Sequence, residues 1–96
     1  MSLSPIVRTH RDAILSLAAR HGAHNVRVFG SMSRDAATAD SDLDLLVEFE
    51  KGRSLYDQVG LIQDLEDLLG VPVDVVSQAA LFPSIRVRVL DEAVAL

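Results

Sequence analysis

Two aspartates, Asp42 and Asp44, stand one residue apart at the start of an apolar run that extends to Val47. Alternate residues of a β-strand share a face, so these two carboxylates would point the same way, about 6–7 Å apart along the strand. Like charges this close repel each other, and burying them is costly without a positive partner. A divalent cation with oxygen ligands removes that conflict, and Mg²⁺ is the usual choice beside phosphates.

A third carboxylate, Asp74, interrupts another apolar stretch between Val73 and Val75. If the two strands share a face, Asp74 joins Asp42 and Asp44 there. Three such carboxylates can hold two divalent cations, one to activate an attacking oxygen and one to steady a leaving group. Each part is weak by itself, because an Asp-x-Asp is more often a solvated strand end and a lone aspartate an exposed edge residue. The prediction depends on the combination.

The complementary half of the site is predicted at Gly30-Ser31, which is separated from Asp42 by ten residues. A glycine lets the backbone approach a ligand closely, and a helix N-terminus presents free N–H groups to an anion. The Ser31 hydroxyl adds one donor, and Ser33 and Arg34 could reach the same phosphates. The stretch therefore predicts a triphosphate-binding site, although a Gly-Ser after a strand is by itself usually only a turn.

Local patterns predict the elements that must position these residues. Ser54 with Asp57 three residues later resembles a capping box, and Gly70 offers a helix stop. The helix between them should bury one apolar stripe, made of Leu55, Val59, Ile62, Leu65 and Leu69. Elsewhere we expect a helix over 5–21, a strand over 25–29, a short helix from residue 31, a loop over 36–41, and strands over 42–49 and 71–77.

The C-terminal segment is ambiguous. Residues 85–89 alternate like a strand, whereas Pro83-Ser84 before them and Glu92 after them suit a helix. We predict a helix. The order is then αβαβαβα, an α/β fold in which helices pack against a short mixed sheet of about three to four strands. The 96 residues are expected to form a single domain over 1–96.

Composition excludes several classes of protein. The chain has no cysteine, which rules out a disulfide framework, a zinc ribbon and a thiol nucleophile. A net charge of −5 argues against broad binding to a nucleic-acid polymer, which needs a basic face. No apolar run approaches the ~20 residues that span a membrane, so we expect a cytoplasmic protein without a membrane partner.

Gly30-Ser31, ten residues, Asp42-Leu43-Asp44 and a later Asp74 together resemble the polymerase-beta-type nucleotidyltransferases. The sequence pattern GSMSR…DSDLDLLVEF is similar to that of their minimal nucleotidyltransferase (MNT, or MntA-like) branch. The resemblance implies that Asp42 and Asp44 ligate two Mg²⁺ ions. Asp74 would ligate the catalytic metal and help to deprotonate the acceptor hydroxyl, and the Gly-Ser pair would hold the triphosphate.

One position departs from the family's pattern. Members often carry a glycine soon after the Ser-x-Arg of this loop, whereas Asp35 follows Arg34 here. An acid near the phosphate side bears on nucleotide affinity and leaves the carboxylate set intact.

The family transfers a nucleoside monophosphate from an NTP to a hydroxyl and releases pyrophosphate. Larger members use an added domain to bind the acceptor, and this chain is too short for one, so a partner should bring the acceptor or be the acceptor. MntA-like proteins are similar to antitoxins that adenylylate a HEPN ribonuclease toxin on a tyrosine hydroxyl. The resemblance thus implies ATP as donor and a HEPN-type toxin as partner, although no residue visibly selects adenine.

Two alternatives stay open. The chain could be an antitoxin that neutralises a partner by binding alone, since its apolar fraction would suit an exposed partner face. It could also be a partner-dependent subunit that modifies a small cationic molecule such as an aminoglycoside.

Overall fold

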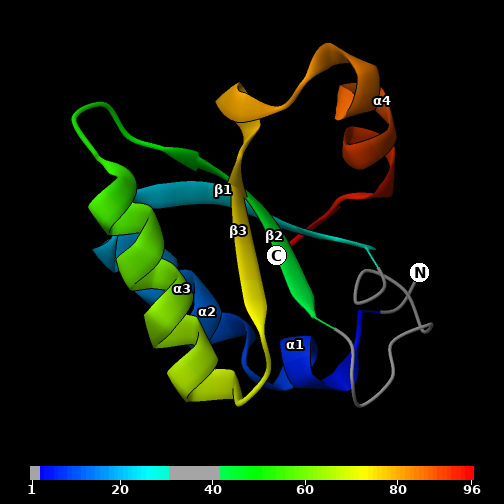
Figure 1. Ribbon diagram of the computed structural model, residues 1–96. Helices are drawn as coiled ribbons and strands as arrows, with labels where there is room; N and C mark the ends of the chain where they lie inside the picture. Colours follow the sequence, from blue (N-terminus) through cyan, green and yellow to red (C-terminus); the bar gives the residue numbers. More distant parts are fainter. Residues whose placement is uncertain (1–2, 31–41) are drawn as a thin grey trace.

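The computed structural model describes residues 3–30 and 42–96 (Figure 1). A four-stranded mixed sheet has the order β3-β2-β1-β4, in which β2 runs antiparallel to β1 and parallel to β3, and β4 runs antiparallel to β1. This arrangement confirms the predicted α/β fold. The elements are α1 (Pro5–Thr9), α2 (Arg11–Arg20), β1 (Ala23–Phe29), β2 (Leu43–Phe49), α3 (Leu55–Leu69), β3 (Val73–Ser77), the short 3-10 helix η2 (Gln78–Ala80), α4 (Pro83–Glu92) and β4 (Val94–Ala95).

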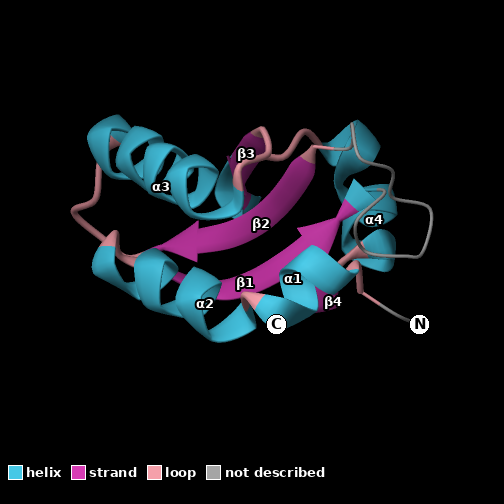
Figure 2. Ribbon diagram, turned by 90° about the horizontal axis from the view of Figure 1, so that it is seen from below, coloured by secondary structure: helices cyan, strands magenta, loops and turns pink. Residues whose placement is uncertain are grey.

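The two faces of the sheet differ. Helices α2 and α3 cover one face, and α4 stands on the other side of the sheet (Figures 1 and 2). Because side chains alternate along a strand, Leu43, Leu45 and Val47 of β2 all enter the core beneath α2 and α3 and are fully buried. Asp44, between the first two, therefore faces away from that core. We call the side of the sheet opposite α2 and α3 the open face.

Residues 5–21 form two helices rather than the predicted one. Helix α1 ends at Thr9 and α2 begins at Arg11, with His10 between them at φ −104° and ψ 13°. The His10 ring nitrogen Nδ1 lies 2.9 Å from the carbonyl oxygen of Ile6, which also accepts the His10 backbone N–H. A side chain that competes for a backbone acceptor in this way favours a break in the helix, and apolar periodicity alone does not reveal it.

Helix α3 confirms the predicted capping box. The Ser54 hydroxyl and the Asp57 carboxylate each accept a backbone hydrogen bond across the first turn, and Gly70 ends the helix at φ +69°. The predicted apolar stripe is only half right, because Leu55 is 71% exposed and Val59 is 43% exposed. The buried residues are Leu61, Leu65 and Leu69. Periodicity predicts the buried face of a helix to within about one residue position. How the helix packs against the sheet decides which of the adjacent residues is buried.

The C-terminal segment is a helix, as predicted, with Pro83 in its first turn. The strand β4 that follows was not predicted, so the order αβαβαβα lacks its last element. Two residues are too few to show an alternation, and the strand is defined only by its pairing with β1, Val94 with Val28 and Ala95 with Arg27. The helix expected from residue 31 and the loop over 36–41 lie outside the described residues. Within residues 3–30 and 42–96, no helix combines the length and apolarity needed to cross a membrane.

The outer edge of β3 is capped by two side chains of α3. Gln58 Nε2 donates to the Val75 carbonyl at 2.6 Å, and the Val73 N–H donates to Glu66 Oε2 at 3.0 Å. An edge strand otherwise presents such groups unpaired. These bonds tie α3 to β3 and so fix the strand that carries Asp74.

Replacing Glu66 with alanine should therefore destabilise the protein by about 1–3 kcal/mol, because a half-buried backbone N–H loses its charged acceptor. The measurement is the free energy of unfolding in urea. Asp67→Ala removes an exposed acid from the same helix and serves as the matched control. Equal stability of the two variants would contradict the capping role of Glu66.

Candidate active site

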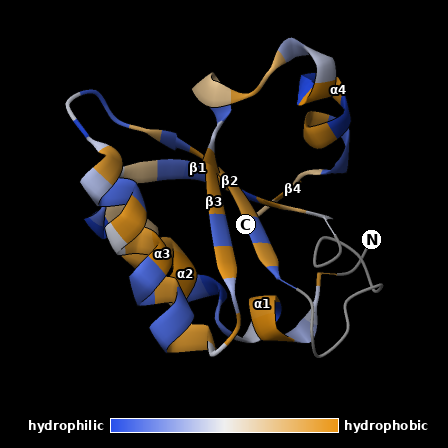
Figure 3. Cartoon of the chain, in the orientation of Figure 1, coloured by the Kyte–Doolittle hydropathy of each residue, from blue (hydrophilic) through white to orange (hydrophobic). Residues whose placement is uncertain are grey.

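Two carboxylates lie side by side on the neighbouring parallel strands β2 and β3. Asp44 and Asp74 are direct partners in the ladder. Strands in a sheet lie about 4.8 Å apart, and paired residues share a face, so both carboxylates project from the open face. Figure 3 shows a hydrophilic segment at the same level in each of these two otherwise hydrophobic strands. Asp42 lies just before β2 and is exposed.

The surroundings of Asp44 disfavour its charge. Its pKa is raised above the ordinary value, first by burial and then by the negative charges of Asp74 and Asp42. A strand carboxylate that is partly shielded from water and flanked by two acids would be stabilised in its ionised form by a nearby cation. Sequence spacing predicted this grouping, and the structure places the three residues close enough to act on one another.

The donor set fits a hard divalent cation. All three side chains offer carboxylate oxygens, the ligands that Mg²⁺ prefers. Within residues 3–30 and 42–96, no group of three acidic or histidine side chains is already arranged to hold a metal ion. The carboxylates of Asp42, Asp44 and Asp74 would have to turn toward a common point, and a bound cation would offset the repulsion that this movement creates.

Gly30 leaves the space that Asp44 occupies. It follows Phe29, the β1 partner of Asp44, and its φ of +72° lies in the left-handed region that favours glycine. A Cβ at this position would lie 2.6 Å from Asp44 Oδ2. Any larger residue would therefore displace the central carboxylate. The predicted phosphate-binding residues Ser31, Ser33 and Arg34 lie outside the described residues. Of the predicted triphosphate site, the structure therefore describes only Gly30.

Sequence reasoning missed two residues of the open face, Arg27 and Gln78. Arg27 pairs with Leu46, two positions along β2 from Asp44. Gln78 directly follows the last residue of β3 and begins η2. Each has a buried side-chain atom, Arg27 Nη2 or Gln78 Oε1, without a hydrogen-bond partner. Arg27 could have been suspected because it stands at the polar position of an alternating segment, between Val26 and Val28, whereas Gln78 carries no such signal.

Residues 7–96 match the family model of the nucleotidyltransferase domain. The chain belongs to this nucleotidyltransferase family. It is 44% identical over 92 residues to the protein adenylyltransferase MntA of Thermococcus cleftensis, which covers 96% of this chain and 90% of the relative. It is also 41% identical over 81 residues to a candidate protein adenylyltransferase of Methanocaldococcus jannaschii, covering 84% and 87% of the two chains. The family assignment and these relatives identify the chain as a nucleotidyltransferase enzyme of the minimal type.

Solved structures agree with this assignment. A candidate minimal nucleotidyltransferase is 58% identical, with a TM-score of 0.85 over 94% of this nucleotidyltransferase and 92% of that chain. More distant structures share the fold alone. One is a toxin–antitoxin pair with AMP-PNP, at a TM-score of 0.76 and 21% identity over 88% and 69% of the two chains. Another is a tri-AMPylated HEPN toxin of Shewanella oneidensis in complex with its MNT antitoxin, at 0.71 and 19% over 92% and 69%.

Because the folded state raises the pKa of Asp44, the ionised carboxylate opposes folding at neutral pH. Asp44→Asn, which carries no charge, should raise the melting temperature of the metal-free protein at pH 7 by a few degrees. The gain should vanish as pH falls below the ordinary aspartate pKa of 3.8, where the wild-type side chain is protonated in both states. Thermal denaturation in EDTA across this pH range is the measurement. Added Mg²⁺ should stabilise the wild type more than the variant. A lower melting temperature of the variant at pH 7 in EDTA would contradict the repulsion between the carboxylates.

Gly30→Ala should lower nucleotidyl transfer more than about tenfold, because a misplaced reactive group is costly to catalysis and the added methyl collides with Asp44. Gly70→Ala is the matched control. Gly70 has a similar φ of +69°, so alanine is equally strained there, but nothing lies within 4 Å of its Cβ position. Both variants should lose about 1–2 kcal/mol of stability from the backbone. An equal loss of activity in the two would show that the contact with Asp44 is unimportant.

Proposed function

We propose that this nucleotidyltransferase is a magnesium-dependent protein adenylyltransferase. It transfers AMP from ATP to a hydroxyl of a HEPN-type toxin and so acts as the antitoxin of the pair. The observation that carries the proposal is the pairing of Asp44 with Asp74 on the open face, with Gly30 against Asp44. The names of the adenylyltransferase relatives and of the toxin–antitoxin structures support the choice of donor and acceptor.

Each site residue has a proposed role. Asp42, Asp44 and Asp74 hold two Mg²⁺ ions, whose bound charge lowers the cost of building negative charge on the reacting phosphate. Gly30 has no side chain, which leaves space beside Asp44 through which a triphosphate can approach. Ser31, Ser33 and Arg34 are the proposed donors to that triphosphate.

The transfer conserves atoms and charge. The acceptor oxygen attacks the α-phosphorus, the bond from that phosphorus to the bridging oxygen of the β-phosphate breaks, and pyrophosphate leaves. In this proposal Asp74 takes the proton of the acceptor hydroxyl, a role that its exposure on the open face supports. Asp44, half-buried beside it, is better suited to hold a cation than to exchange protons with solvent.

A second candidate, an antitoxin that acts by binding alone, is favoured by helix α4. None of its residues is buried. Two apolar side chains at or near it, Phe82 and Val87, are 72% and 70% exposed. An apolar helix face left in water suits a protein partner.

The deciding experiment incubates the purified protein with α-labelled ATP, Mg²⁺ and the product of the adjacent gene, the proposed HEPN-type toxin. Label should appear on the toxin. Asp44→Asn should reduce labelling by more than the ~10–100-fold typical of outer-shell metal partners, because a direct ligand is lost. Asp67→Asn, an exposed acid on α3, is the charge-matched control and should label normally.

Undiminished labelling by Asp44→Asn would exclude the proposed mechanism. A toxin that is neutralised without label, equally well by the wild type and by the Asp42→Asn/Asp44→Asn variant, would assign the protein as a binding antitoxin.

A further inference from the structure

The open face holds an unusual concentration of unsatisfied polar atoms. Among the described residues, the buried side-chain nitrogen and oxygen atoms without a hydrogen-bond partner are Arg27 Nη2 and Gln78 Oε1. Arg27 has the strand parity that faces away from α2 and α3 and pairs with the fully buried Leu46 of β2, and Gln78 begins η2 directly after the end of β3. Buried polar groups are almost always paired, so a donor and an acceptor left over on one face indicate a ligand that pairs with them.

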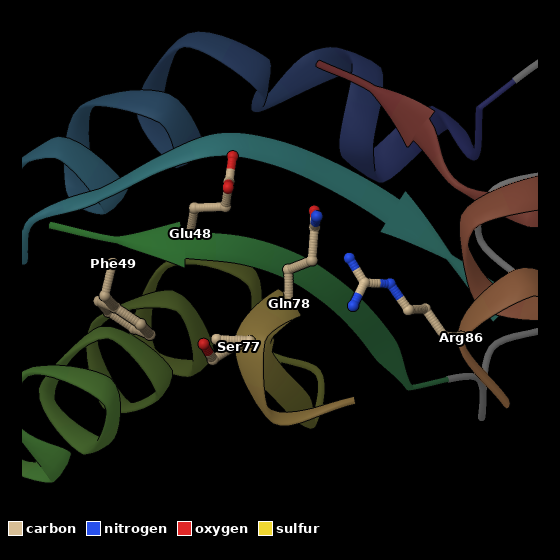
Figure 4. A pocket seen from close by; sticks show the side chains of 6 residues that line it. Glu48, Phe49, Ser77, Gln78 and Arg86 are labelled. Atoms are coloured by element: carbon tan, nitrogen blue, oxygen red, sulfur yellow. The ribbon is translucent and has the colours of Figure 1, made fainter. Parts of the chain in front are cut away.

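Gln78 lines a cavity on this face. The cavity has a volume of about 300 Å³, at the lower end of the range for small-molecule sites. Figure 4 shows its walls: Glu48 from β2, Gln78 where β3 passes into η2, and Arg86 reaching in from α4. The complete lining is Glu48, Phe49, Ser77, Gln78, Ala79 and Arg86.

The polar groups of the cavity are complementary in type. Gln78 offers an acceptor, and the guanidinium of Arg86, which points back toward Gln78 in Figure 4, offers only donors. Glu48 is already engaged, since its Oε2 accepts from Asn25 Nδ2 at 2.7 Å. The terminal torsion of a glutamine is soft, so a small rotation turns Oε1 from its shielded position into the cavity.

The cavity lies at a useful distance from the carboxylates. Glu48 is four residues from Asp44 along β2, which corresponds to about 13 Å of strand, and Gln78 lines the same cavity as Glu48. An extended nucleoside monophosphate with its phosphate at Asp44 covers most of such a span. Arg27 lies between the two ends, opposite Leu46, where the ribose would pass.

We propose that this cavity binds the base of the donor nucleotide and that Gln78 makes it select adenine. The inference rests on the proposed function, because it takes the nucleotide to lie with its α-phosphate at Asp44. Adenine presents a donor, its N6 amine, beside an acceptor, N7. Gln78 Oε1 accepts from the amine and Arg86 donates to the ring nitrogen.

Guanine does not match this arrangement. It presents two acceptors, O6 and N7, on the corresponding edge. With Gln78 Oε1 turned toward the base, O6 would meet a second acceptor, and guanine could pair only if the amide turned over and presented Nε2. Selection of adenine therefore requires that Gln78 present Oε1, an orientation that the Gln78→Glu variant below reproduces because a carboxylate only accepts.

The test is isothermal titration of the protein with ATP, GTP and inorganic tripolyphosphate, each with Mg²⁺. Wild type should bind ATP at least about tenfold more tightly than GTP. Gln78→Leu should weaken ATP binding about tenfold and leave tripolyphosphate binding within twofold. Gln78→Glu, which keeps an acceptor and loses the donor, should retain the preference for ATP. Circular dichroism checks that each variant is folded.

Matched controls separate the cavity from general effects. Gln63→Leu makes the same change at an exposed site on α3. Arg86→Gln should weaken ATP binding, whereas Arg88→Gln should not, although both remove one charge from α4. The side chain of Arg88 is 83% exposed and does not line the cavity.

The inference is overturned if Gln78→Leu leaves ATP binding unchanged, or weakens ATP and tripolyphosphate equally. It is also overturned if Gln78→Leu and wild type show the same ratio of ATP to GTP affinity. These outcomes are independent of the proposed function, which fails instead if Asp44→Asn still labels the toxin. Selective, Gln78-dependent ATP binding without transfer to any protein would retain the base site and reject the acceptor.

Discussion

The repulsion between carboxylates on β2 and β3 is the constraint that organises this protein. Parallel pairing puts Asp44 directly beside Asp74, and partial burial adds to the cost of ionising Asp44. A fold that only had to be stable would place apolar or oppositely charged residues there. The proposed role of the pair, which is to bind positive charge, accounts for this cost, and the rest of the chain supplies the stability that the pair does not.

That stability comes from the other face of the same strands. Leu43, Leu45 and Val47 alternate with the acidic positions and are fully buried beneath α2 and α3. The alternation of β2 thus separates two tasks by a single residue step, with packing on one face and chemistry on the other. Helix α3 contributes twice, because it covers the core and because Gln58 and Glu66 hold the outer edge of β3 in place.

The open face combines charge of both signs along one direction. Acidic side chains occupy the end of the sheet where β1 turns at Gly30, and Arg27 and Arg86 lie farther along. A ligand that carries phosphate at one end and a hydrogen-bonding ring at the other suits this order. Helix α4 borders the same face with exposed apolar residues, which suits a protein partner.

The sequence by itself determined the local features, because they depend on spacing. The spacing of Asp42 and Asp44 around the start of β2, the capping box at Ser54 and the stop at Gly70 all follow from period and cap chemistry. The order of the main elements and the resemblance to the nucleotidyltransferases followed too. The roles assigned to Ser31, Ser33 and Arg34 remain predictions, since those residues lie outside the part of the chain that the structure describes.

Only the tertiary structure decided the contacts between distant segments. The pairing register puts Asp44 beside Asp74, the fit of Asp44 against Gly30 explains the glycine, and the position of the sheet selects Leu61 over Leu55 for burial. The break at His10 and the two-residue strand β4 leave no periodic signal. Gln78 had no signal either, because a glutamine after a strand becomes informative only when its oxygen is found buried without a partner. Spacing specifies what neighbours along the chain can do, whereas burial and pairing depend on residues that only folding brings together.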